Sequence, residues 1–291
     1  MIRWKGIIWS IHPLFVLVML ASVVTGYFIE LITLFAIVIV HELGHVLAAR
    51  GLGWTVREVK LLPFGGVAEI EEAGYIPAKE EMFIAAAGPL QNGWMAAAAF
   101  ALGQWGGLSS EWSEHFVQAN MMIGLFNLLP VLPLDGGKLL QALLSYRIPF
   151  HITLVWGARI SLLFSASMVI YALVIGWPTG IQMNVLTIGI FLFVSNWTYL
   201  RNVPYIFVRF LMRREQAAAN RVWQGALAQP IVVTGHNTVH AILRLFMKER
   251  YHLIYVMGER GAIVAVLPEE RVVDGFLIHG KAGSAVHELF R

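Results

Sequence analysis

The sequence predicts a polytopic α-helical membrane protein, with about six transmembrane helices, a membrane-associated β-hairpin and a small C-terminal α/β domain. Of its 291 residues, 58% are hydrophobic and 13% are charged, whereas soluble domains carry about 25% charged residues. A change to charged and Ala-rich composition near Arg209 marks the start of the C-terminal part. Six apolar segments are each long enough to cross about 30 Å of hydrocarbon as a helix: residues 12–28, 30–50, 79–104, 115–145, 152–176 and 183–207.

The placement of Lys and Arg predicts the orientation of these spans. The first apolar segment is expected to remain as a span, because it lacks a small-residue cleavage site and a second apolar segment follows it almost at once. Lys and Arg gather on the cytoplasmic side of a membrane protein. The turns near 29, 105–114 and 177–182 contain neither, whereas the turns on the opposite side are rich in them. Both termini are therefore expected in the cytoplasm, which agrees with six spans.

Two further segments have recognisable secondary structure. Residues 56–72 are β-rich around a Pro-Phe-Gly-Gly turn and predict a hairpin. The hairpin is expected either on the surface or dipping toward a polar cavity. Within the membrane, the hydrogen-bonding groups of a non-helical backbone must be satisfied by protein or water. The C-terminal part follows a helical linker and predicts a small α/β unit. Its expected elements are strand 230–233, helix 239–249, strand 252–257, strand 262–267 and helix 269–277.

The second apolar segment contains the run His41-Glu42-Leu43-Gly44-His45. Residues i and i+4 share one face of a helix, so the two imidazoles can reach one tetrahedral zinc ion. The glutamate between them can act as general base for a water that zinc activates, and can then protonate a leaving amine. The alternative is a set of ordinary polar residues at a water-facing helix end. Ionisable residues inside a span usually serve a function, so the pattern favours a zinc-dependent hydrolase.

A catalytic zinc site needs a third protein ligand, and Asp135 is the candidate. It is the only carboxylate in the last three apolar segments. Asp135 lies 12 residues before Arg147, and His41 lies nine residues before Arg50. At about 1.5 Å per residue, both side chains are expected within roughly a turn of the same depth. The absence of cysteine restricts any transition-metal site to His, Asp and Glu.

Pro130 and Pro133 are expected to break the fourth apolar segment just before Asp135. Broken helices at membrane depth usually line a polar cavity. His12 and His151 remain alternative third ligands. Asn92, within the run AAAGPLQN of the third segment, could also point toward such a cavity.

Together these motifs resemble the site-2 protease family of intramembrane metalloproteases. They are HELGH, Asn-x-x-Pro-x-x-Pro-Leu-Asp-Gly-Gly and AAAGPLQN, and the resemblance covers about residues 1–207. It implies an intramembrane zinc metalloendopeptidase that hydrolyses a peptide bond in a membrane-associated protein. It implies one zinc per chain, with His41, His45 and Asp135 as ligands and Glu42 as catalytic base.

The same resemblance assigns residues to the substrate. Asn127 and Pro130 match positions that help to hold substrate near the zinc. The hairpin around Gly65 and Gly66 resembles a β element that faces the substrate.

The predicted domains are a transmembrane metalloprotease domain at 1–207, a linker at 208–224 and a cytoplasmic domain at 225–291 that resembles one cystathionine-β-synthase (CBS) domain. That resemblance implies ATP as a possible ligand and a homo-oligomer through CBS pairing, since a lone CBS unit lacks its usual partner. Many such domains hold ribose with a Thr or Ser that is followed three residues later by Asp. The corresponding stretch here, Leu267-Pro268-Glu269-Glu270-Arg271, lacks this pattern.

A six-span core with one C-terminal CBS domain is similar to the family members that process a sporulation sigma factor. The similarity implies a membrane-tethered pro-sigma-factor substrate, inhibitory membrane proteins as partners, and the mother-cell membrane around the forespore as the location. The lipid bilayer is a further expected partner, and nucleic acid is not.

Two other functions are compatible with parts of the sequence. A divalent-metal transporter gated by a CBS domain could use HELGH to coordinate passing zinc. Such a pathway would need acidic or His residues in several spans, yet the last two spans carry only Arg159 and Arg201 as charges. A catalytically inactive scaffold is the second alternative, and the intact HELGH and Asp135 argue against it. Substrate cleavage that depends on Glu42 would discriminate among the three.

Overall fold

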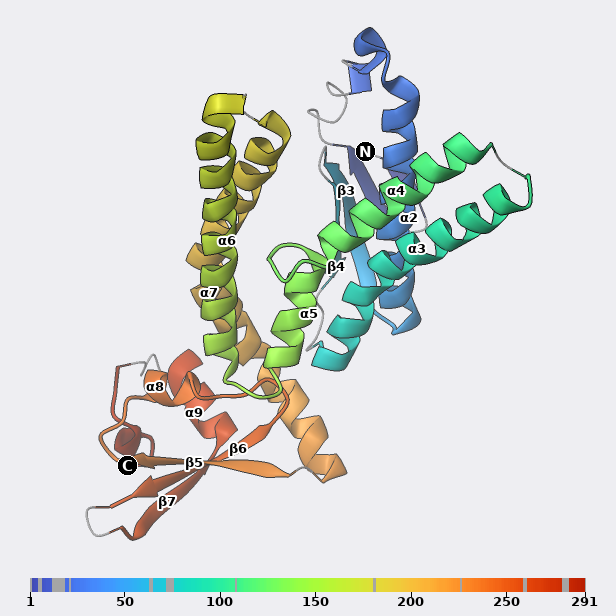
Figure 1. The fold of residues 1–291 in the computed structure, drawn as a ribbon. Coiled ribbons are helices and arrows are strands. Elements are labelled where there is room, and N and C mark those ends of the chain that lie inside the picture. The colour runs from blue at the N-terminus through green and yellow to red at the C-terminus, as the bar shows by residue number, and fades with distance from the viewer. Residues whose placement is uncertain are drawn as a thin grey trace. The chain divides into compact units, whose positions relative to one another are not determined.

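The computed structural model describes residues 2–4, 7–11, 19–20, 22–62, 65–71, 76–107, 109–179, 182–225, 227–258, 261–278 and 283–290. In these residues the protein is mainly helical, with two small β-sheets (Figure 1). The chain folds as two compact units. The first comprises Met1–Ala73, Lys79–Leu140 and Phe164–Leu192, and the second comprises Gly74–Ala78, Gln141–Leu163 and Phe193–Arg291.

Three helices of the described residues contain stretches long and apolar enough to cross a membrane. These stretches are all of α2 (Phe28–Gly51), Phe150–Val174 within α6 (Phe150–Thr179), and Met183–Arg214 within α7 (Met183–Gln224). They correspond to the second, fifth and sixth predicted spans. Residues 12–18 and 21 of the first predicted span lie outside the described residues.

The third and fourth predicted spans correspond to three helices. Helix α3 (Ala78–Gln104) has 27 residues, a length of about 40 Å. The fourth predicted span consists of α4 (Ser110–Asn127) and α5 (Asp135–Leu144), with a non-helical segment between them. The predicted break is confirmed, because a proline lacks the N–H that continues a helix and Pro130 and Pro133 both fall in this segment.

The first unit contains a four-stranded sheet in the order β1-β2-β3-β4. Strands β3 (Thr55–Leu62) and β4 (Gly65–Glu71) form the predicted antiparallel hairpin. Strands β1 (Ile2–Trp4) and β2 (Ile7–Ile11) were not predicted, because such short apolar runs cannot be told from the start of a span by periodicity. β2 runs parallel to β3. Helix α2 packs against β3 and β4, so the hairpin lies along the helix that carries HELGH.

The second unit contains a three-stranded sheet near the C-terminus. Its order is β5 (Ala228–Thr234), β6 (Tyr251–Met257), β7 (Ile263–Pro268), with β5 parallel and β7 antiparallel to β6. Helix α9 (Glu269–Leu277) packs against β6 and β7, and a short 3-10 helix η1 (Val286–Leu289) packs on α9. The predicted strands and the predicted helix 269–277 agree with these elements.

The predicted helix 239–249 is wrong in length, because α8 ends at Leu243 (Val239–Leu243). Tight turns follow it and carry Phe246 into the core, where its side chain is fully buried. The carbonyl of Phe246 also accepts a hydrogen bond from the N–H of Phe150 over 2.9 Å. Tertiary packing of one aromatic residue therefore overrides the local helix propensity.

A single apolar core joins the C-terminal sheet to the start of α6 and the middle of α7. Members of this core that are buried include Leu154 of α6, Phe207 and Leu211 of α7, Ile254 of β6 and Val272 of α9. The second unit is thus one folded body, in which α7 continues without interruption as far as Gln224.

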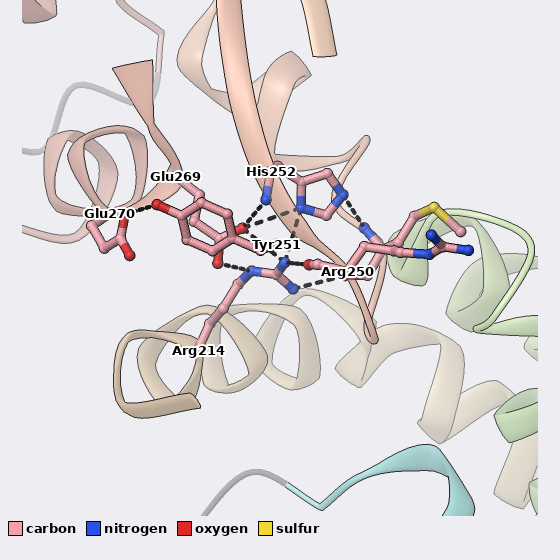
Figure 2. A network of polar contacts seen from close by, with 7 residues as sticks. Arg214, Arg250, Tyr251, His252, Glu269 and Glu270 are labelled. Carbon is pink, nitrogen blue, oxygen red and sulfur yellow. Dashed lines mark hydrogen bonds and ion pairs between the residues drawn. The ribbon is translucent and has the colours of Figure 1, made fainter. Parts of the chain in front are cut away.

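Arg214 of α7 is the centre of a buried polar network in this core (Figure 2). Its Nε and Nη2 donate to the two carboxylate oxygens of Glu269, each over 2.9 Å. Its Nη1 donates to the carbonyl of Met247 over 2.8 Å, and its Nη2 also contacts the carbonyl of Arg250. A buried, bidentate arginine with these partners ties α7 directly to α9 and to the segment before β6.

His252 of β6 completes the network. The N–H of Met247 donates to its Nε2 over 3.3 Å, so that nitrogen is the acceptor. Its Nδ1 lies 3.1 Å from Oε2 of Glu269 and 2.9 Å from Nη2 of Arg214. The backbone N–H of His252 donates to the same oxygen over 2.8 Å. The buried carboxylate is therefore compensated from three sides, as a buried charge must be.

Candidate metal centre

His41 and His45 lie one turn apart on α2, and both are buried. Their Nε2 atoms are 3.2 Å apart, and Oδ2 of Asp135 lies 3.1 Å from each of them. A tetrahedral zinc ion with ligand bonds of about 2.0–2.1 Å has ligand atoms about 3.3 Å apart. The three atoms thus form a triangle of the size that one zinc ion requires.

Hydrogen bonds on the far side of each ring turn the Nε2 lone pairs toward this triangle. Nδ1 of His45 lies 2.7 Å from the carbonyl oxygen of Ile84, and Nδ1 of His41 lies 2.6 Å from Oδ1 of Asn92. Both partners are acceptors, so Nδ1 carries the proton on both rings and Nε2 is free to bind a metal. Both acceptors belong to α3.

Gly88 of α3 leaves open the space in front of the two imidazoles. A Cβ at this position would lie 2.7 Å from Nε2 of His41 and closer still to Nε2 of His45. Gly44 of α2 permits the close approach of the two helices, because a Cβ there would lie 2.7 Å from the carbonyl oxygen of Ala87. A side chain at Gly88 would crowd both Nε2 atoms, so glycine at this position, with the ligand triangle, fits a bound zinc.

Asp135 reaches the two histidines from the first turn of α5. It is buried, with 4% of its surface exposed. Its Oδ1, on the side away from the rings, lies 3.3 Å from Nζ of Lys138. Gly136 and Gly137 follow it, and a Cβ at either position would overlap the backbone of the segment 128–132. The glycine pair therefore lets the chain fold tightly enough to present the carboxylate.

Glu42 lies beside this triangle and is buried, with 6% of its surface exposed. Ligand-type atoms of His41, Glu42 and His45 all lie within 4.8 Å of one another. A carboxylate at this distance is placed to exchange a proton with a water in front of the imidazoles.

Comparison with known proteins identifies the family. Residues 29–118 and 105–168, which include α3 to α5 and all but the first residue of α2, match the sequence profile of peptidase family M50. The chain is also 33% identical over 289 residues to stage IV sporulation protein FB of Bacillus subtilis strain 168, covering 99% of this chain and 98% of that protein. The chain belongs to peptidase family M50. This result confirms the predicted resemblance to site-2 proteases.

Two further comparisons give matches in Methanocaldococcus jannaschii, one to a protein sequence and one to a solved structure. The sequence match is to a zinc metalloprotease that is 29% identical over 243 residues, covering 81% of this chain and 66% of that protein. The solved structure is that of a site-2 protease, which this chain matches with a TM-score of 0.54 and 26% identity, covering 69% of this chain and 94% of that one. The chain is therefore a zinc metalloprotease with the site-2 protease fold, which favours the protease over the transporter and scaffold alternatives.

The structure also places the residues of this M50 chain that were assigned to the substrate. Asn127 is the last residue of α4, and its amide donates to the carbonyl of Ile123 over 3.1 Å. Pro130 is exposed between α4 and α5. Gly65 and Gly66 begin β4, opposite the last two residues of β3. The role of these four residues stays a prediction.

The structure describes one of the two alternative third ligands. His151 belongs to the second unit, where its ring packs edge-on against Phe207 at 5.1 Å. His12 lies outside the described residues. Two contacts of the site were missed by the sequence reading, the carbonyl of Ile84 and the amide of Asn120, which binds Asn92. A polar residue in the middle of an apolar segment was the available signal for Asn120.

Proposed function

We propose that this M50 chain is an intramembrane metalloprotease whose zinc is held by His41, His45 and Asp135, with Glu42 as general base. The observation that carries the proposal is the triangle of Nε2, Nε2 and Oδ2 atoms 3.1–3.2 Å apart. Both rings are held with Nε2 toward the centre. The distances match tetrahedral zinc, and the lack of a side chain at Gly88 keeps a Cβ from crowding both Nε2 atoms.

The residues divide the chemistry between them. Zinc supplies Lewis acidity, which polarises a peptide carbonyl and activates water. Glu42 takes the proton of the attacking water and returns it to the leaving amine, which is general base and then general acid catalysis. Ile84 and Asn92 hold the two rings. The burial of all four protein groups strengthens these electrostatic interactions, because bulk solvent is kept away from them.

Substitution of Glu42 and of Asp135 should separate catalysis from metal binding. Glu42→Gln is expected to keep zinc and to lower cleavage of a membrane-tethered substrate by about 10²- to 10⁴-fold. Asp135→Ala is expected to lose both the bound zinc and the cleavage activity, since two histidines alone leave the site one protein ligand short. The measurement is the zinc content of each purified variant alongside cleavage by the same sample. Cleavage at the wild-type rate by Glu42→Gln, or full zinc occupancy in Asp135→Ala, would refute the assigned roles.

The substrate that we propose is an inactive sporulation sigma factor whose pro-sequence is removed at the membrane. Support comes from the similarity over nearly the whole chain to stage IV sporulation protein FB. The corresponding partners are the inhibitory membrane proteins called stage IV sporulation protein FA and bypass-of-forespore protein A. The corresponding location is the mother-cell membrane around the forespore. We expect the substrate to contact Asn127, Pro130, Gly65 and Gly66. The packing of β4 against α2 supports this role for the hairpin.

We also propose that the chain crosses the membrane six times with both termini in the cytoplasm. Three helical stretches with the required length and hydropathy support this count, as does the 27-residue length of α3. A reporter fused after Arg214 should read cytoplasmic, and one inserted near Ser110 should read external, as the Lys and Arg distribution requires. A cytoplasmic signal near Ser110 would contradict the six-span topology. A reporter that is exported by its own signal sequence is the positive control for an external signal.

For the C-terminal part, we propose a single CBS domain at 225–291, after a segment 208–224 that continues α7 from the transmembrane domain at 1–207. The sheet with α8 and α9 supports it. Pairing of two chains through this domain, and ATP as its ligand, stay predictions. Glu269 stands in the stretch where such domains hold ribose, and here Arg214 and His252 bind its carboxylate instead.

A further inference from the structure

A chain of hydrogen bonds leads from His41 to the backbone of α4. Oδ1 of Asn92 lies 2.6 Å from Nδ1 of His41, and Nδ2 of Asn92 donates to Oδ1 of Asn120 over 3.2 Å. Nδ2 of Asn120 donates in turn to the carbonyl of Phe116 over 2.9 Å. Asn92 and Asn120 are both buried, with 1% and 0% of their surfaces exposed. Water therefore cannot substitute for a missing partner in this chain.

The direction of every bond in this chain follows from its last member. A backbone carbonyl can only accept a hydrogen bond, so the side chain of Asn120 must turn Nδ2 toward Phe116 and Oδ1 toward Asn92. Asn92 must then present Nδ2 to Asn120 and Oδ1 to His41. An acceptor at this place requires the proton of His41 on Nδ1, which leaves Nε2 as the lone-pair nitrogen.

The two histidines reach the same tautomer by different routes. His45 binds a backbone carbonyl directly, that of Ile84. His41 instead binds a side-chain amide, whose two ends differ only in which atom is oxygen. Rotation of that amide by half a turn would place a donor against Nδ1 of His41. The second amide is therefore needed to choose between the two orientations.

We propose that Asn120 is a positioning residue for zinc binding, which acts through Asn92 to hold His41 in the tautomer and ring orientation that bind the ion. The proposal rests on the assignment of His41 as a zinc ligand. Helix α4 thereby takes part in the metal site without supplying a ligand. Gly124, one turn after Asn120, allows the close approach, because a Cβ there would lie 3.1 Å from Cβ of Asn92.

Substitutions of comparable size should show the effect in the zinc affinity of the full-length protein in detergent, measured by competition with a chromophoric chelator. Asn92→Leu removes the acceptor and is expected to weaken zinc binding by about 10- to 100-fold. Asn120→Leu leaves Asn92 in place but frees it to rotate, and is expected to weaken binding by about tenfold. The visible spectrum of bound cobalt(II), which reports ligand geometry, should change in both variants.

A double-mutant cycle separates this role from packing. Asn92→Asp offers oxygen to His41 in either orientation, so it needs no partner to orient it. Asn120→Leu added to Asn92→Asp should therefore cost no further affinity, and should improve it by removing the oxygen that faces the new carboxylate. An equal loss from Asn120→Leu in both backgrounds, or wild-type affinity in Asn120→Leu alone, would overturn the proposal.

Two further variants complete the experiment. Ser113→Ala is the matched control, because Ser113 also joins α4 to α3, by donating to the carbonyl of Ala99 over 2.7 Å, without touching His41. It should bind zinc as the wild type does, and a loss equal to that of Asn120→Leu would overturn the proposal. His41→Ala tests the underlying ligand assignment. Zinc affinity lost in His41→Ala but kept in Asn120→Leu would refute the positioning role alone, whereas affinity kept in His41→Ala would refute the ligand assignment.

Discussion

Gly88→Ala is expected to abolish zinc binding and proteolysis without unfolding the protein. The added methyl group would lie 2.7 Å from Nε2 of His41 and 2.5 Å from Cε1 of His45, inside van der Waals contact. The rings cannot turn away freely, because Asn92 and Ile84 hold their Nδ1 atoms. The methyl group therefore displaces the ion or spreads the ligand triangle. Alanine favours a helix over glycine by about 1 kcal/mol, so α3 itself should not be weakened.

The measurement is the zinc content of purified Gly88→Ala together with cleavage of a membrane-tethered substrate and the helical circular dichroism of the sample. Gly93→Ala is the matched control on the same helix, since a Cβ at Gly93 has no atom within 4 Å. The control should keep zinc and activity. Full zinc occupancy in Gly88→Ala would mean that the ion does not lie between the two imidazoles and α3.

Arg214→Ala is expected to release the C-terminal sheet from α7. The substitution leaves the carboxylate of Glu269 buried without its bidentate partner, with 1% of that residue exposed. Breaking a buried ion pair by removing one partner costs about 3–5 kcal/mol. The side chain also stacks on Phe210 and Phe246, with its guanidinium carbon 5.3 Å and 5.0 Å from the ring centres. That packing is lost as well.

Hydrogen exchange of the full-length protein measures this loss locally. The backbone amides of β6 should exchange about 10²- to 10³-fold faster in Arg214→Ala, because the strand is expected to open together with the network. Arg214→Lys keeps the charge but not the fork of donors, so an intermediate effect is expected. Arg271→Ala is the control, because it removes the same charge from the exposed side of α9. Exchange as slow in Arg214→Ala as in this control would show that the network does not hold the sheet.

The same network predicts how the stability of the C-terminal part depends on pH. Burial opposes ionisation of Glu269, but the hydrogen bond from His252 and the charge of Arg214 outweigh it, so the pKa of this carboxyl lies below its ordinary value. A depressed pKa stabilises the folded state at pH values above the ordinary glutamate pKa of about 4 to 4.5. The stabilisation is lost as the pH falls through that range toward the lower pKa. Glu269→Gln should flatten this dependence in the same exchange experiment.

Local patterns in the sequence were sufficient for much of the fold. The i, i+4 spacing of His41 and His45 determines that both rings share a face of α2, whatever packs against it. The prolines at 130 and 133 determine that the fourth apolar segment breaks before Asp135. The Pro-Phe-Gly-Gly turn similarly predicted the hairpin β3–β4, and the C-terminal strand ranges predicted the strands of the small α/β unit. Each of these features depends on neighbours within a few residues.

Other features were decided only by tertiary structure. The pairing of β1 and β2 with the hairpin, and the end of α8 at Leu243, depend on partners far away in the sequence. The same holds for the hydrogen bond of Asn92 to His41, 51 residues away. The sequence alone suggested Asp135 as a ligand, but only folding brings its Oδ2 to 3.1 Å from both Nε2 atoms. Gly44 and Gly88 set how closely α2 and α3 approach. That distance between backbones has no local signature, because periodicity shows which face of a helix is apolar but not which residue faces it across the gap.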